Sequence, residues 1–196
     1  MTLNVVRLDD VAPQSWRNGG GVTRELLTWP NADDWILRLS VADIEKDGPF
    51  SAFPRVQRWI VALTGVGMEL GEPFNFRIEP GMPPYRFHGE YAPMCILIDG
   101  PTSDLNLMIN ERRASGWLRR IVSDSASSKD GLWLATSGPL SVDLCGFFTW
   151  AGITLRTRRG KVVVPPRSLV WSQNDVRDWR ISDITGCWGF QCSLST

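Results

Sequence analysis

Hydrophobic and polar residues alternate along most of this chain with a period of two, which is typical of β-strands that bury one face. Residues 22–29 form the first clear run, and turn-forming residues at 30–34 end it. Residues 35–44 form the second run, which ends at Lys46-Asp-Gly-Pro-Phe50. Further strands are predicted at 57–63, 68–70, 74–78, 85–87, 94–98 and 104–110. Proline and glycine separate nearly all of these runs, as in an antiparallel sandwich or barrel.

A second series of short runs begins near Trp117, after a helix candidate at 110–118. A polar loop is expected at 123–131. Strands are predicted at 118–122, 131–137, 140–148, 153–156, 161–164, 168–172, 179–184 and 187–193. The two series together predict an all-β fold of two small β-barrels or sandwiches packed as one unit.

Composition and charge exclude several classes of function. The 196 residues are 43% hydrophobic and 21% charged, as in a soluble globular protein. Because 21 basic residues balance 21 acidic ones, no nucleic acid is expected as a partner. Lys46, Lys129 and Lys161 are the only lysines, so arginine dominates. The planar guanidinium suits carboxylate recognition, although a genome rich in arginine codons is an alternative explanation.

Compartment and metal chemistry are constrained in the same way. The N-terminus lacks the basic start and apolar core of a secretory signal, and the longest apolar stretch, 59–70, is too short to span a membrane. The four cysteines show no Cys-x-x-Cys spacing, so we expect buried, reduced thiols in a cytoplasmic protein. A three-histidine metal site is excluded because His88 is the single histidine.

The densest candidate for chemistry is Trp16-Arg-Asn-Gly-Gly-Gly-Val-Thr-Arg-Glu25. Three glycines permit a tight turn and close backbone approach. No Gly-Lys-Ser/Thr follows them, so this segment is not a phosphate-binding loop. Two interpretations remain open, a plain turn before the first long strand or a turn that presents recognition groups.

Strand alternation places polar side chains together on two other strands. Arg38 and Ser40 lie on one face of 35–44, and Asp104 and Asn106 lie on one face of 104–110. This polar stripe is either the wet face of an open sheet or the lining of a small barrel. In a barrel, together with Glu25, it would form an amphoteric site for a small zwitterionic or carboxylated molecule.

Other candidates carry weaker signals. His88 precedes a glycine and lacks an obvious nucleophile, so a surface position is expected. The 47–54 segment, together with Arg58, is expected to form an ordered loop that plugs one barrel end with Phe50 and Phe53. The basic pairs at 112–113 and 119–120 and the cluster at 156–161 are expected to be solvated. Glu25 and Asp104 are acid–base candidates whose separation the sequence leaves undefined.

Four segments taken together resemble the HutD/Ves family: 16–25, Trp35-Ile-Leu-Arg-Leu-Ser-Val-Ala-Asp43, Asp47-Gly-Pro-Phe-Ser51 and Asp104-Leu-Asn-Leu-Met108. The resemblance covers residues 8–112 well. It implies a bicupin fold, with a cupin barrel holding the ligand pocket in 1–115 and a cupin-like barrel in 116–196. It implies neither a bound metal nor another cofactor, and no established reaction. The ligand-binding residues that it implies are Trp16, Arg17, Asn18, Thr23, Glu25, Arg38, Asp104 and Asn106.

The sequence departs from the family pattern at two positions that bear on the ligand. His88 stands where the family often has Asp, and Leu105 where it often has an aromatic residue. The family is associated with bacterial histidine-utilisation operons. The resemblance therefore implies a cytoplasmic protein that moderates this pathway by binding an intermediate such as urocanate or formylglutamate.

Three hypotheses for function follow. In the first, a small-molecule carboxylate is the partner: Arg38 pairs with it, Asn18 and Asn106 add hydrogen bonds, and Trp16 forms an apolar wall. The second is a metal-independent isomerase or lyase that uses an acid–base carboxylate, and it rests on the fold alone. The third is an interaction module for a partner protein. No membrane partner is expected, and exposed strand edges are compatible with a homodimer.

Overall fold

The computed structural model describes residues 3–121, 143–173, 179–182 and 185–195. The chain divides into two compact units, Val11–Ser115 and Met1–Asp10 with Gly116–Leu194. The first ten residues thus group with the second unit, whereas the sequence analysis assigned them to the first. The reason is β1 (Asn4–Arg7), which pairs antiparallel with β16 (Ser168–Ser172). The predicted strand at 131–137, the 123–131 loop and part of 140–148 lie outside the described residues.

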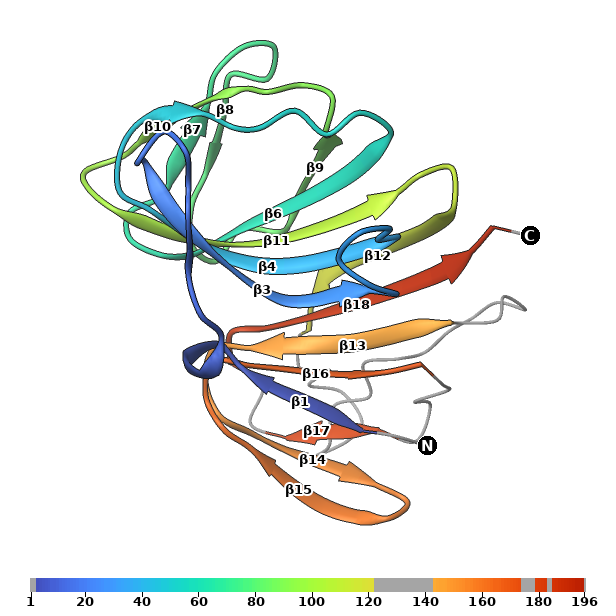
Figure 1. The fold of residues 1–196 in the computed structure, drawn as a ribbon. Coiled ribbons are helices and arrows are strands. Elements are labelled where there is room, and N and C mark those ends of the chain that lie inside the picture. The colour runs from blue at the N-terminus through green and yellow to red at the C-terminus, as the bar shows by residue number, and fades with distance from the viewer. Residues whose placement is uncertain (1–2, 122–142, 174–178, 183–184, 196) are drawn as a thin grey trace. The chain divides into compact units, whose positions relative to one another are not determined.

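The Val11–Ser115 unit is built from two sheets, visible in Figure 1. The six-stranded sheet has the order β2 (Gln14–Ser15), β3 (Gly21–Trp29), β4 (Leu37–Ile44), β11 (Thr102–Asn110), β6 (Val56–Thr64), β9 (Tyr85–His88). The four-stranded sheet has the order β5 (Gly48–Pro49), β10 (Met94–Leu97), β7 (Met68–Leu70), β8 (Phe76–Ile78). Every pairing with a described register is antiparallel, as the alternation predicts.

An apolar cluster fills much of the space between these two sheets. Ile44 and Ile60 come from the six-stranded sheet, and Met68, Ile78 and Cys95 come from the four-stranded sheet. All five are at most 1% exposed. On β4 and β6, every second residue counted from Ile44 and Ile60 therefore points into the interior of the unit.

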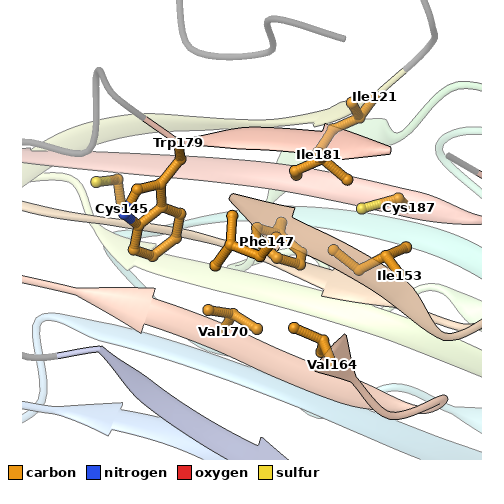
Figure 2. Close-up of a cluster of buried hydrophobic side chains, with 10 residues drawn as sticks. Ile121, Cys145, Phe147, Ile153, Val164, Val170, Trp179, Ile181 and Cys187 are labelled. Atoms are coloured by element: carbon orange, nitrogen blue, oxygen red, sulfur yellow. The ribbon is translucent and has the colours of Figure 1, made fainter. Parts of the chain in front are cut away.

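The second unit also contains two described sheets. One has the order β1, β16, β13 (Leu144–Thr149), β18 (Cys187–Leu194), β12 (Ala114–Arg120). The other has the order β15 (Gly160–Val164), β14 (Ile153–Thr157), β17 (Arg180–Ser182). Figure 2 shows Phe147 among Trp179, Ile153, Val164 and Val170 in an apolar core.

The predicted all-β class is confirmed, because the described residues contain eighteen strands and one 3-10 turn, Leu8–Asp10. Of the two expected forms, barrel or sandwich, each unit has the two-sheet sandwich, because among the described strands the hydrogen-bonded ladders end at edge strands instead of closing. The helix predicted at 110–118 is wrong. Residues 111–113 form a turn, and β12 follows and joins the sheet beside β18. Ser115 and Gly116 favour a helix weakly, and long-range pairing decides the conformation.

Candidate functional site

The polar stripe predicted on two strands lies inside the Val11–Ser115 unit, in three consecutive cross-strand rows. Asp104 lies opposite Ala42 and Ala62. The next row places Asn106 opposite Ser40 and Ile60. The third row places Met108 opposite Arg38 and Arg58. Since Ile60 and Ala62 belong to the apolar cluster, these polar residues face the interior instead of forming a wet outer face.

Asp104 is the most deeply buried acid of this set, with 1% of its surface exposed. Neither of its side-chain oxygens accepts a hydrogen bond from the described protein residues. Burial raises the pKa of Asp104 to about 7; the positive charge of Arg58 opposes this rise, and the negative charge of Asp43 adds to it. A carboxyl group in this position is able both to donate and to accept a proton near neutral pH.

Arg58 is a buried cation with aromatic rings on several sides. Its guanidinium carbon lies 5.1 Å from the ring centre of Phe50, 5.7 Å from that of Phe53 and 5.0 Å from that of Phe87. One Nη donates to the carbonyl oxygen of Ser51 at 3.4 Å, while Nε has no partner among the described residues. Burial lowers the pKa of Arg58 to about 10, with Asp104 opposing and Arg38 reinforcing the shift.

Arg38 is already engaged by neighbouring groups. Its Nη1 donates to Glu25 Oε1 at 3.2 Å and its Nη2 to Met108 Sδ at 3.3 Å. The guanidinium also lies 5.4 Å from the ring centre of Trp35 and 5.0 Å from that of Phe53. Burial lowers the pKa of Arg38, and Glu25 opposes that shift. The Glu25 and Arg38 side chains are 25% and 18% exposed, so this pair is where the buried polar rows approach solvent.

Glu25 and Thr23 extend the rows onto β3. Glu25 lies opposite Ser40, and its second carboxylate oxygen accepts a hydrogen bond from Thr28 at 3.3 Å. Thr23 lies opposite Ala42 and accepts a hydrogen bond from the indole nitrogen of Trp16 at 2.8 Å. Trp16 packs against the apolar cluster, which makes it a wall beside the Asp104 row.

The structure places Arg17 and Asn18 elsewhere, on the exposed turn between β2 and β3. Asn18 Oδ1 accepts a hydrogen bond from the backbone N–H of Gly20 at 3.0 Å, which stabilises the turn. Gly19 has a φ of 65°, in the left-handed region that glycine tolerates. The structure therefore brings Trp16, Thr23, Glu25, Arg38, Asp104 and Asn106 to the interior rows, while Arg17 and Asn18 build the adjoining turn.

Arg58 was expected only beside the 47–54 loop, and the predicted set of ligand-binding residues does not contain it. It stands inside a run of otherwise mostly apolar residues on β6 and is only 3% exposed. Strand alternation alone indicates that Arg58 shares a face of β6 with Ile60. The position of Arg58 in the same row as Arg38, with Met108 between them, depends on the strand register. The 47–54 loop supplies Phe50 and Phe53, which cover the guanidinium of Arg58.

His88 lies on the surface, as expected. It ends β9, and its Nδ1 is 3.4 Å from Glu111 Oε2 with both side chains largely exposed. Within the described ranges, no group of three His, Cys, Asp or Glu side chains is placed to hold a metal ion. All four cysteines are buried. No described helix is long and apolar enough to cross a membrane.

Comparisons with known proteins connect this arrangement to one family. A family model described as HutD matches residues 8–157. A Pseudomonas putida protein described as an uncharacterized 21.2 kDa protein in the hutC 3′ region is 34% identical over 154 residues, which are 74% of this chain and 79% of that protein. The protein Ves of Cronobacter sakazakii is 35% identical over 107 residues, 53% of this chain and 59% of that protein.

Solved structures extend the similarity to the whole fold. HutD from Pseudomonas fluorescens SBW25, in a formate condition, superposes with a TM-score of 0.79 at 22% identity and full coverage of both chains. A cupin 2 conserved barrel domain protein from Leptotrichia buccalis gives a TM-score of 0.55 at 10% identity, over 98% of this chain and 96% of that one. At these identities the likeness establishes the fold alone, and it confirms the expected cupin-like architecture.

Proposed function

The chain belongs to the HutD family, and we propose that it binds a small carboxylate inside its Val11–Ser115 unit. The binding protein would moderate histidine utilisation in the cytoplasm by taking up a pathway intermediate such as urocanate or formylglutamate. A relative found in the hutC 3′ region supports the link to this pathway.

The observation that carries this proposal is a set of buried polar atoms that the protein itself does not satisfy. Within the described residues, Asp104 Oδ1 and Oδ2, Asn106 Oδ1, Arg38 Nε and Arg58 Nε have no hydrogen-bond partner. Buried polar groups are nearly always hydrogen-bonded in folded proteins, and leaving one unsatisfied costs roughly 1–3 kcal/mol. A small polar ligand would satisfy several of these atoms together.

The charge and shape of the site favour a carboxylate. The guanidinium groups of Arg38 and Arg58 both lie near the ring of Phe53. Among the described residues, Arg38 has an anionic partner within 4.0 Å, Glu25, whereas Arg58 has none. Guanidinium groups bind carboxylates through paired, charge-assisted hydrogen bonds. The rings of Trp16, Phe50 and Phe53 provide apolar surface for the rest of a small molecule.

The binding proposal is tested by isothermal titration with urocanate, formylglutamate, histidine and formate. We expect one of them to bind and Arg38→Ala to weaken that binding by about 2–5 kcal/mol, because a buried charge partner is removed. Arg86→Ala is the matched control, since Arg86 is exposed on β9 and stacks on Trp59 instead. Unchanged affinity in Arg38→Ala, or no binding to wild type, contradicts the proposal.

A metal-independent isomerase or lyase is the second candidate, and the pKa of Asp104 near 7 favours it. Of the two carboxylates, Asp104 suits acid–base work better, because both oxygens of Glu25 accept hydrogen bonds from Arg38 and Thr28. Turnover of a bound compound that Asp104→Asn abolishes without weakening binding supports this candidate. Binding without turnover supports the binding protein.

A further inference from the structure

Opposite charges are separated along β11 in the interior of the Val11–Ser115 unit. Asp104 lies at one end of the polar rows, and Arg58 lies beside Met108 two rows further on. Four residues on a strand span about 13 Å between Cα atoms. Arg58 influences the charge of Asp104, yet no ion pair within 4.0 Å joins them among the described residues. Asn106 occupies the row between them.

The Arg58 end and the Asp104 end of the polar rows lack different binding partners. The guanidinium of Arg58 has aromatic rings and one carbonyl oxygen as neighbours, and no described carboxylate reaches it. The carboxyl of Asp104 accepts no hydrogen bond from described residues. An anionic group suits the first end, and a hydrogen-bond donor suits the second. Arg38 differs from Arg58 because Glu25 already balances its charge.

We propose that the site selects an amphoteric ligand and holds it in one direction along β11, with its carboxylate on Arg58 and an N–H group donating to the carboxylate of Asp104. This inference rests on the proposed function and specifies its ligand class and orientation. Asn106 contacts the middle of the ligand, and Arg38 adds a second guanidinium to the anionic end from its partly exposed side.

The proposed contact at Asp104 makes binding depend on pH. The charged groups that affect Asp104 are Arg58 on β6 and Asp43 on β4, with the Cys95 thiol facing it from β10 and the Arg38–Glu25 pair further along the rows. Without ligand, the pKa of Asp104 is about 7. A donated N–H favours the ionised form and lowers this pKa in the complex. Ligand binding below pH 7 therefore releases the proton of Asp104, and the affinity for the ligand increases as the pH rises.

A matched pair of probes tests the N–H contact on wild-type protein, so the result does not depend on the folding of any variant. N-formylglycine carries a carboxylate and an amide N–H, whereas N-formylsarcosine carries a methyl group in place of that hydrogen. Neither compound titrates between pH 6 and 8. By isothermal titration at pH 8, N-formylglycine should bind at least tenfold more tightly, because a buried acceptor that loses its donor is left unsatisfied. Its affinity should fall about tenfold from pH 8 to pH 6, because protonation of Asp104 opposes binding.

Variants of Asp104 and Arg58 test which residue binds which end of the ligand. Asp104→Asn should remove the pH dependence, because an amide does not titrate, and Asp104→Ala, which leaves no acceptor, should also remove the preference for the N–H. Arg58→Gln should weaken both probes at least thirtyfold, as expected for loss of a buried charge-assisted contact. Arg86→Gln is the control for arginine loss on the neighbouring strand and should bind like wild type. The melting temperature and circular dichroism of each variant show that it is folded, and Arg58→Lys keeps the charge if Arg58→Gln does not fold.

Three outcomes overturn this inference: equal affinity for the two probes, affinity that rises on acidification, or unchanged binding in Arg58→Gln. Rising affinity at low pH would mean that a protonated Asp104 donates to the ligand. If the probes fail while urocanate or formylglutamate binds and is lost in Arg38→Ala, only the orientation is wrong. If no carboxylate binds at all, the proposed function fails together with this inference.

Discussion

Two carboxylates of the same site differ because their surroundings differ. Glu25 is partly exposed and its oxygens accept hydrogen bonds from Arg38 and Thr28, so it serves as a fixed counter-charge. Asp104 is buried without a described hydrogen-bond donor, and desolvation raises its pKa to about 7. At the scale of single residues, the charge of Asp104 therefore changes near physiological pH.

This difference predicts how stability depends on pH. The pKa of Asp104 is about 7 in the folded protein and 3.8 as its reference value, so the folded state binds the extra proton between these pH values. The free energy of unfolding contributed by Asp104 therefore falls as pH rises from about 4 to about 7, in total by about 4 kcal/mol. Urea unfolding at pH 5, 6, 7 and 8 measures this slope, and Asp104→Asn should remove it.

Asp34→Asn is the control for this experiment. Asp34 is exposed and pairs with Arg113 at the surface, so the slope should remain in this variant. A wild-type protein whose stability rises through the same pH window would contradict the predicted ionisation of Asp104.

At the scale of elements, the start of β3 depends on close backbone contact with β4. A Cβ added at Gly21 would lie 2.3 Å from the carbonyl oxygen of Asp43, too close for any alanine. A Cβ added at Gly19 meets nothing within 4 Å, but Gly19 has a positive φ. We expect Gly21→Ala to destabilise the protein by more than about 2 kcal/mol and Gly19→Ala by about 1 kcal/mol. Thermal unfolding of both variants checks this order, and equal losses would contradict the close contact.

The alternation of hydrophobic and polar residues predicts most strands, because a half-buried strand shows this pattern within its own residues. Strands β3, β4, β6 and β11 lie within two residues of their expected bounds, and the polar faces of β4 and β11 meet as their patterns indicate. Register is a property of strand pairs, so the alignment of Arg58 with Arg38 through Met108 could not be predicted. The local pattern predicts a helix at 110–118 and a strand only from 118, whereas β12 begins at Ala114, because pairing with β18, which lies far along the sequence, decides the conformation.

Across the whole molecule, the two units have different interiors. The buried polar residues described in the second unit are all uncharged: Thr149, Ser168, Ser172 and Gln191. The interior of the Val11–Ser115 unit includes Arg58, Asp104 and Asn106, all less than 9% exposed. The assignment of residues 1–10 to the second unit could not be read from local patterns, because it depends on pairing between Val5 and Val170. Burying charges lowers stability, so the charged side chains retained inside the Val11–Ser115 unit support the binding role proposed for that unit.

The contrast between the two interiors predicts that stability and ligand binding can be separated. Phe147 is fully buried and lies 6.0 Å from Trp179, ring centre to ring centre. Phe147→Leu should lower the free energy of unfolding by about 1–2 kcal/mol through lost packing. Its carboxylate affinity should stay within twofold of wild type, because the variant leaves every polar group of the proposed site in place. Urea unfolding and isothermal titration on the same preparation measure both quantities. An affinity loss as large as that of Arg38→Ala would mean that the second unit takes part in binding.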